Sequence, residues 1–140
     1  MQRWMVVFVL VFTLVLFFVV KTTEDSEVIT VLSTAYYAPL PNQSRYATGS
    51  YEGDIRLNGT GITKSGKVVE RGHIAADWTI LPQGTVVHIP GYGRGIVEDI
   101  GSAIKGNRID LFMGYGEEAL EEALQWGRRE KRVIVVSRPN

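Results

Sequence analysis

Short runs of β-branched and aromatic residues alternate with turns over most of the chain, and this alternation limits the folds that the chain can adopt. Glycine and proline separate the runs, as in Ser65-Gly66 and Pro82-Gln83-Gly84, and most of the fifteen glycines lie between Gly49 and Gly116. Short strands joined in this way are typical of a compact β-barrel. The strands are predicted at Val28–Tyr37, Lys67–Glu70, His73–Ala76, Thr85–Ile89, Gly95–Asp99 and Lys131–Ser137.

Two other segments have a different character. Ala38–Gly61 contains prolines, glycines and polar residues and is predicted to be a long irregular loop. Gly116–Trp126 is predicted to be the one good helix, because acidic residues lie in its first turn and arginines follow its end. The apolar stripe that would pack on the barrel contains Leu120, Ala123, Leu124 and Trp126.

The stretch from Trp4 to Val20 has no charged residue and is almost wholly apolar, with Arg3 before it and Lys21 after it. As a helix it would be about 25 Å long, which is short for a membrane span and long for the core of a signal peptide. A chain of 140 residues has no core large enough to surround such a helix. We therefore expect this stretch to enter a membrane.

The residues beside this stretch indicate whether it is cleaved and on which side of the membrane the rest of the chain lies. No small-x-small cleavage pattern follows Val20, which favours an uncleaved signal anchor over a cleaved signal peptide. Arg3 precedes the stretch and acidic residues follow it, so the N-terminus should remain in the cytoplasm. We expect a single-pass protein of the cell membrane, with 1–27 as anchor and linker and 28–140 as an extracytoplasmic domain. Cleavage would instead make that domain a secreted one.

The composition excludes several classes of function. Fifteen Lys and Arg residues balance fifteen Asp and Glu residues, so no excess of charge points to nucleic acid as a partner. The chain has no cysteine, which excludes disulfides, thiolate metal sites and a cysteine nucleophile. His73 and His88 do not have the spacing of metal ligands, and no calcium-loop pattern is present. We expect neither a metal nor another cofactor.

Three aspartates stand in short blocks between Gly72 and Met113. The blocks are Ala75-Ala76-Asp77, Val97-Glu98-Asp99-Ile100-Gly101 and Arg108-Ile109-Asp110-Leu111. Together with the intervening segments, such as Leu81-Pro82-Gln83-Gly84-Thr85, they resemble the Asp-Asp-Asp (3D) domain family. The resemblance is dense from Gly72 to Met113, looser over the final helix and strand, and weak before Gly61.

This resemblance implies a mainly β fold, a six-stranded double-psi β-barrel with one C-terminal helix. Such barrels occur in membrane-bound lytic transglycosylase A and in the muralytic stationary-phase survival proteins. Those enzymes cleave the β-1,4 bond after N-acetylmuramic acid in peptidoglycan without water and leave a 1,6-anhydro sugar. Because the C6 hydroxyl of the sugar is the nucleophile, one carboxylic acid can protonate the leaving oxygen and then accept the hydroxyl proton. Burial or a second carboxylate raises the pKa of such an acid toward neutrality.

The resemblance assigns Asp110 as the catalytic acid and base. It makes Asp99 a neighbour that tunes the proton affinity of Asp110 or holds a substrate hydroxyl, and Asp77 the third residue of the site. Asp110 also stands out without the family, because an unpaired aspartate in the apolar run Ile109–Leu111 costs energy when buried. Without the resemblance, Asp77 is better interpreted as a turn or capping residue, and Asp99 as an Asx-turn residue.

Thr34-Ala35-Tyr36 resembles the first barrel strand of related glycanases, in which a threonine and a tyrosine face the cleft. Thr34 and Tyr36 are therefore candidate substrate-binding residues. In the related inverting endoglucanases an aspartate base lies two residues after that tyrosine, where this chain has Ala38. The missing base favours cleavage without water, although Asp54 in the long loop could take its place.

Thr63 and Lys64 occupy the place of a Gly-x-Thr segment of the family and are further candidates for binding substrate. The alternative is a plain polar hairpin with Ser65-Gly66 as its turn. The sequence as a whole favours a peptidoglycan lytic transglycosylase. A peptidoglycan hydrolase and a non-catalytic glycan-binding barrel remain alternatives, because one fold hosts several functions. The expected partners are the glycan strands of peptidoglycan and the membrane.

Overall fold

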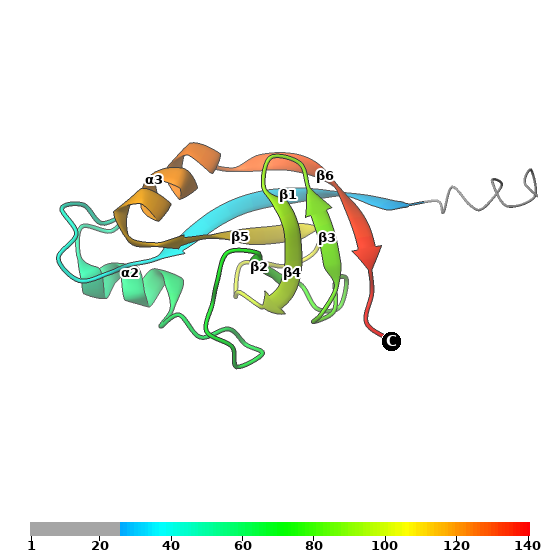
Figure 1. Cartoon of the computed structure of the whole chain (residues 1–140), viewed down its shortest axis with the longest axis horizontal. Coiled ribbons are helices and arrows are strands. Elements are labelled where there is room, and N and C mark those ends of the chain that lie inside the picture. The colour runs from blue at the N-terminus through cyan, green and yellow to red at the C-terminus, as the bar shows by residue number, and fades with distance from the viewer. Residues whose placement is uncertain (1–25) are drawn as a thin grey trace, which may run out of the picture.

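The computed structural model describes residues 26–140, which form a closed barrel of six strands with two helices beside it (Figure 1). The strands are β1 (Glu27–Ala38), β2 (His73–Ala76), β3 (Val86–Ile89), β4 (Gly93–Asp99), β5 (Arg108–Tyr115) and β6 (Arg129–Ser137). The helices are α2 (Tyr51–Asn58) and α3 (Gly116–Trp126). The predicted anchor at Trp4 to Val20 lies outside the described residues. Within residues 26–140, no helix has the length and apolar character needed to cross a bilayer.

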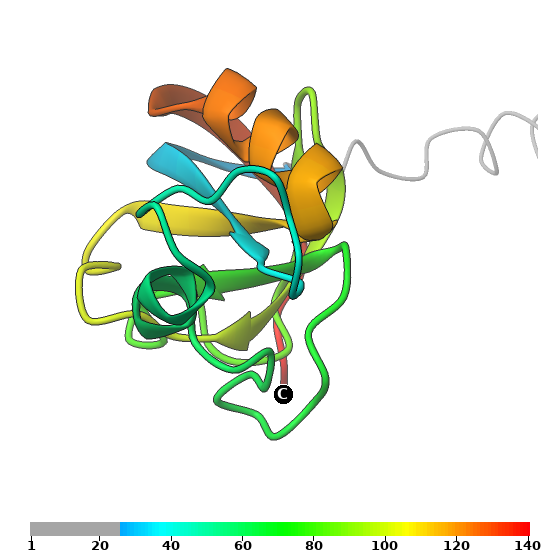
Figure 2. The same ribbon diagram turned by 90° about the vertical axis from the view of Figure 1, so that its left-hand side faces the viewer.

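The barrel closes in the order β1-β5-β2-β4-β3-β6. β1 pairs parallel with β5 and antiparallel with β6, and β2 pairs parallel with β4. α3 and α2 lie on opposite sides of the end of the barrel where β1 and β5 run (Figure 1 and Figure 2). The mainly β, six-stranded barrel predicted from the sequence is confirmed.

Side chains from all six strands fill the barrel, as the period of two along a strand requires. Each of these side chains contributes about 1.5–3 kcal/mol by leaving water. The most buried of them include Val31, Ile74, Val87, Val97, Ile109, Leu111 and Val133. Because Ile109 and Leu111 both point into the core, Asp110 between them points to the other face of β5.

The predicted helix Gly116–Trp126 is confirmed as α3. Leu120 and Trp126 are buried as expected, but Ala119 is buried too, whereas Leu124 is 49% exposed and lies outside the stripe. The predicted basic C-terminus is present, because the Arg129 side chain donates hydrogen bonds to the carbonyl oxygens of Trp126 (2.7 Å) and Gln125 (2.8 Å). These bonds satisfy carbonyls that the end of the helix leaves free.

The prediction of a wholly irregular loop over Ala38–Gly61 is wrong, because it contains α2. Ser50 caps the helix by accepting the backbone N–H of Gly53 at 3.0 Å. Gly53 obscured the helix in the sequence, since glycine is a poor helix former. The structure explains its presence, because a Cβ at this position would lie only 2.1 Å from the Thr48 hydroxyl oxygen.

The predicted strand Lys67–Glu70 is also wrong. That segment makes only an isolated bridge, between Ile62 and Val68, and Val68 is 67% exposed. The predicted strand His73–Ala76 is present with its predicted ends as β2, and the other four predicted strands are present with shifted ends. The sixth strand of the barrel is β5, which extends the apolar run around Asp110 to eight residues.

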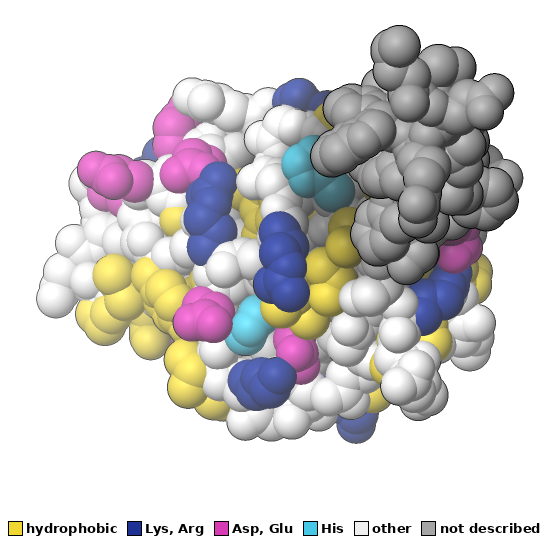
Figure 3. Space-filling view, turned by 45° about the vertical axis from the view of Figure 1, so that its right-hand side comes forward, with side chains coloured by type: hydrophobic (Ala, Val, Ile, Leu, Met, Phe, Trp, Pro, Cys, Tyr) yellow, Lys and Arg dark blue, Asp and Glu magenta, His cyan; other side chains and the backbone are white. Residues whose placement is uncertain are grey.

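Charges of both signs are interspersed on the surface. On the face in Figure 3, Lys and Arg side chains lie beside Asp and Glu side chains. Ion pairs such as Arg71–Glu122 (2.8 Å) and Arg138–Glu27 (2.7 Å) join segments distant in the sequence. The exposed pairs contribute little stability each.

Candidate active site

Asp110 lies in β5, in register with Thr34 of β1 on one side and Ala75 of β2 on the other. The Thr34 hydroxyl donates a hydrogen bond of 2.9 Å to Oδ1 of Asp110. Burial raises the pKa of Asp110 to about 6, with the charge of Asp99 acting in the same direction and the Thr34 hydrogen bond and Arg108 acting against it. A carboxyl group with this pKa can donate and accept a proton near neutral pH.

Asp99 is the last residue of β4 and is also in register with Ala75. Asp99 and Asp110 therefore lie on the two strands that flank Ala75, whose small side chain leaves room between them. Oδ1 of Asp99 accepts the backbone N–H groups of Lys64 (2.8 Å) and Ile100 (2.9 Å). The structure thus brings two of the three predicted aspartates together.

A cavity of about 110 Å³ lies at this place, and its lining includes Tyr36, Asn58, Asp99 and Asp110. The Tyr36 hydroxyl oxygen is buried and has no hydrogen-bond partner among residues 26–140. Burial and then the charges of Asp99 and Asp110 raise the pKa of Tyr36, so its hydroxyl stays protonated. An unsatisfied buried hydroxyl costs about 1–3 kcal/mol, and a substrate oxygen could satisfy it.

Asp77 does not line this cavity. Its Oδ1 accepts the hydroxyl (2.7 Å) and the backbone N–H (3.0 Å) of Thr79, and its Oδ2 accepts the N–H of Gly106 at 2.9 Å. The hydrogen bonds, that from Gly106 first, lower the pKa of Asp77. The carboxylate therefore holds a turn and the loop before β5. This agrees with the interpretation of Asp77 as a turn residue from the sequence.

Thr63 and Lys64 do not line this cavity either. Thr63 is buried, and its hydroxyl lies 2.8 Å from the Ser65 hydroxyl and accepts the N–H of Lys67 at 3.1 Å. The backbone N–H of Gly66 closes the turn on the Thr63 carbonyl at 2.9 Å. Lys64 contributes to the site through its backbone N–H on Asp99.

The sequence profile of the 3D domain family matches residues 72–137. This segment is a 3D domain. It contains Asp77, Asp99 and Asp110, whereas Thr34, Tyr36 and α2 precede it in the chain. The candidate site is therefore formed by the 3D domain together with the segment before it.

Two proteins of Bacillus subtilis are similar to this chain. YabE, named for cell wall shaping, is 35% identical over 122 residues, which are 85% of this chain and 26% of YabE. The cell wall-binding protein YocH is 32% identical over 114 residues, which are 81% of this chain and 34% of YocH. The chain thus spans about a quarter to a third of the length of these relatives.

Among solved structures, the lytic transglycosylase MltA of Escherichia coli is 26% identical with a TM-score of 0.48, over 56% of this chain and 28% of MltA. The same values hold for MltA with bound chitohexaose. The lytic transglycosylase LtgG of Burkholderia pseudomallei is 24% identical with a TM-score of 0.40, over 54% of this chain and 27% of LtgG. Each of these similarities covers little more than half of this chain and less than a third of the solved structure.

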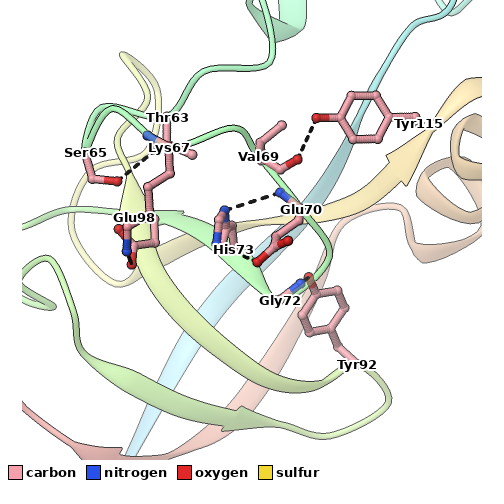
Figure 4. A network of polar contacts seen from close by, with 10 residues as sticks. All are labelled: Thr63, Ser65, Lys67, Val69, Glu70, Gly72, His73, Tyr92, Glu98 and Tyr115. Atoms are coloured by element: carbon pink, nitrogen blue, oxygen red, sulfur yellow. Dashed lines mark hydrogen bonds and ion pairs between the residues drawn. The ribbon is translucent and has the colours of Figure 1, made fainter.

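Polar contacts tie the loop that leads into β2 to the rest of the barrel (Figure 4). Nζ of Lys67 lies 2.7 Å from Oε1 of Glu98, which is buried in β4 next to Asp99. Farther along, the Tyr115 hydroxyl donates to the Val69 carbonyl at 2.6 Å, and the Tyr92 hydroxyl accepts the Gly72 N–H at 2.8 Å. These contacts fix the loop whose Lys64 N–H reaches Asp99.

Asp54, which the sequence offered as a substitute base, is fully buried in α2 and does not line the cavity. Its carboxylate accepts the Tyr37 hydroxyl, the Ala47 N–H (2.8 Å), and the N–H (2.7 Å) and hydroxyl (2.7 Å) of Thr48. Burial by itself raises the pKa of Asp54, but these hydrogen bonds together outweigh it and hold the pKa below its ordinary value. Asp54 therefore supports the fold and is not placed to activate water at Asp110.

The lining residues Leu57 and Asn58 belong to the last turn of α2. Sequence reasoning missed them because this helix was not predicted, and Ser50 with acidic residues after it was the only signal available. Among residues 26–140, no group of three or more His, Asp and Glu side chains is arranged to hold a metal ion.

Proposed function

We propose that the 3D domain, completed by β1 and α2, cleaves the glycan strands of peptidoglycan as a lytic transglycosylase. The observation that carries this proposal is the carboxyl group of Asp110, whose pKa burial raises to about 6, in a cavity shared with Tyr36 and Asp99. At pH 7 roughly one Asp110 in ten would then carry its proton, against fewer than one in a thousand for an ordinary aspartate. That difference suits a general acid.

In the proposed reaction, protonated Asp110 donates its proton to the glycosidic oxygen while the bond from C1 to that oxygen breaks. The negative charge of Asp99 stabilises the oxocarbenium-like centre, and the unsatisfied Tyr36 hydroxyl donates to a substrate oxygen. The Asp110 carboxylate then accepts the proton of the C6 hydroxyl as O6 bonds to C1. The product is a 1,6-anhydro sugar, and Asp110 is protonated again for the next cycle.

The residue at position 38 favours this reaction over inverting hydrolysis. An inverting hydrolase needs a second carboxylate across the sugar, about 6.5–9.5 Å from the acid, to activate water. Here the carboxylates in the cavity lining are Asp99 and Asp110, on the two strands next to Ala75, and Oδ1 of Asp99 accepts two backbone N–H groups. Ala38 is buried and supplies no base.

A non-catalytic glycan-binding barrel is the second candidate. The relative YocH is named a cell wall-binding protein. The cavity of about 110 Å³ is also small beside the roughly 300–1,000 Å³ of typical ligand sites. In such a protein Asp110 would only accept hydrogen bonds from sugar hydroxyls.

Mass spectrometry of purified murein digested by the full chain tests the proposal. The expected products end in 1,6-anhydro-N-acetylmuramic acid and are one water lighter than hydrolysis products. Products with a reducing end would show a hydrolase instead. Murein that is bound but left intact would support the binding protein.

Replacing Thr34 by valine is expected to shift the pH dependence of kcat toward higher pH. The Thr34 hydrogen bond stabilises the ionised carboxylate, so its loss raises the pKa of Asp110 and keeps the acid protonated at higher pH. Valine keeps the shape of the side chain. The alkaline limb of the kcat profile measures the shift, and a limb that moves to lower pH would contradict the role given to Asp110.

The proposal also includes where the enzyme acts. Trp4 to Val20 would anchor the chain in the cell membrane, with a double-psi barrel outside the cytoplasm beside its substrate. The barrel should therefore appear in the membrane fraction and be digested by protease added outside intact cells. Protection from that protease would contradict the orientation.

A further inference from the structure

A second cavity, of about 330 Å³, lies near the C-terminal end of α3, and it shares no lining residue with the cavity of Asp110. Its walls come from α3, from the β3–β4 turn, from β5, from the start of β6 and from the loop before β2. The residues that decide its chemistry are Arg71, Tyr92, Glu122, Trp126, Arg129 and Lys131. The proposed glycan chemistry uses none of them.

The aromatic rings of Tyr92 and Trp126 are held in place from inside the barrel. Their centroids are 6.4 Å apart in an edge-to-face arrangement. The Trp126 indole N–H donates to the Ser33 hydroxyl at 3.1 Å, and the Tyr92 hydroxyl donates to the Phe112 carbonyl at 2.8 Å. Both polar atoms are therefore satisfied, and the rings give the cavity a fixed apolar wall.

Cations lie against these rings. The Arg129 guanidinium carbon is 4.8 Å and the Lys131 Nζ 5.1 Å from the centroid of Trp126, and the Arg71 guanidinium carbon is 5.4 Å from that of Tyr92. Arg129 is fixed further by its bonds to two carbonyl oxygens of α3. The positive groups are thus in position before any ligand binds, which lowers the entropic cost of binding.

Lys131 occupies a position where the strand pattern calls for an apolar residue. It lies on the same face of β6 as Val133 and Val135, which are both buried in the core. A lysine in this register has to keep its ammonium group solvated or paired. Here Nζ lies at the edge of the cavity, where a Cβ at Gly91 would be 3.6 Å from it.

The cavity has an excess of positive charge at one side and a carboxylate at the other. Glu122 is paired with Arg71 through Oε2 at 2.8 Å, which leaves Oε1 as an acceptor. Arg129 and Lys131 form no ion pair within the part of the chain that the structure describes. A ligand that matches this pattern has a carboxylate, an apolar body and an N–H donor or ammonium group.

We propose that this cavity binds the carboxyl-terminal end of a short peptide. The terminal carboxylate lies between Arg129 and Lys131, because a guanidinium and an ammonium group suit its oxygens. The side chain of the last residue packs on Trp126 and Tyr92, and an N–H of the peptide donates to Glu122. Such a site would hold a peptide on the substrate polymer while the separate cavity of Asp110 acts on its glycan.

Calorimetric titration of the full chain with D-alanyl-D-alanine tests this assignment, with the indole N–H resonance of Trp126 as a second readout. Binding is expected for the dipeptide and should weaken at least tenfold for its C-terminal amide. Lys131→Met keeps the aliphatic contact with Trp126 and should also weaken binding at least tenfold, while Lys131→Arg should restore it. Arg132→Met is the matched control, because it removes one positive charge from the opposite face of the same strand.

Equal affinity for the dipeptide and its amide would overturn the proposal, as would unchanged binding in Lys131→Met. Inorganic phosphate that binds as tightly as the dipeptide would show a general anion site and overturn the peptide assignment. Absence of binding by the dipeptide would overturn it as well. All these readouts measure binding alone, so they are independent of whether Asp110 cleaves glycan.

Discussion

Asp110→Asn is expected to lower kcat for murein cleavage by about 10²–10⁴-fold, the usual contribution of a general acid. Asparagine keeps the size of the side chain and can still accept the Thr34 hydrogen bond, but it cannot donate a proton to a leaving oxygen. Affinity for the glycan should change little, because the proton is transferred only in the transition state. Release of soluble muropeptides and co-sedimentation with murein measure the two quantities separately.

Loss of folding would not explain this result. The pKa of Asp110 is higher in the folded protein than its ordinary value of 3.8, so the folded state gains protons relative to the unfolded state between these values. Stability therefore falls as pH rises through this interval, and the ionised carboxyl destabilises the fold at pH 7. Asp110→Asn should unfold at no lower temperature than the native chain at pH 7.

Asp77→Asn is the matched control for Asp110→Asn. It removes a charge from the same set of three aspartates, but from a carboxylate that holds a turn outside the cavity. Activity at moderate temperature should fall by less than tenfold, with a lower unfolding temperature. Cleavage retained in Asp110→Asn and lost in Asp77→Asn would contradict the proposed site.

The sequence was sufficient for the parts of the fold that depend on local pattern. The alternation of Ile109, Asp110 and Leu111 predicts that Asp110 leaves the core, and the structure places it so, with both neighbours fully buried. The helix Gly116–Trp126 was predicted to the residue, because acidic residues lie in its first turn and a glycine and two arginines follow its last residue. Strand ends were less accurate, since pairing partners far along the chain decide them.

The features that the sequence could not reveal depend on contacts between distant residues. Asp99 and Asp110 meet only because β2 places Ala75 between their strands. The unsatisfied hydroxyl of Tyr36 depends on burial against residues far along the chain, such as Phe112 of β5, whose ring centroid lies 5.3 Å from that of Tyr36. Lys131 reads as an ordinary charge at the start of a strand, and it becomes unusual only once Trp126 and Val133 are seen on the same side of β6.

Asp54→Asn is expected to lower the free energy of unfolding by about 3 kcal/mol, because an amide NH₂ group would face backbone N–H and hydroxyl donors that now share one carboxylate. For a barrel of this size the unfolding midpoint should fall by roughly 10 °C. Leu57 and Asn58 at the end of the same helix line the cavity of Asp110, so KM for murein should rise as well. Thermal unfolding followed by near-ultraviolet circular dichroism measures the loss.

The pH dependence of the stability difference between the native chain and Asp54→Asn identifies the cause of the lower stability. The pKa of Asp54 lies below its ordinary value of 3.8, so the stability that the carboxylate contributes is complete above pH 3.8 and disappears as pH falls through the lower, folded value. The native chain and Asp54→Asn should therefore differ fully at pH 7 and approach each other in strong acid. Glu52→Gln, which removes an exposed carboxylate from the same helix, should change stability by less than about 0.5 kcal/mol at any pH. If Asp54→Asn were equally harmless at pH 7, the buried carboxylate would not be what holds α2 over the site, and the helix would owe its position to packing alone.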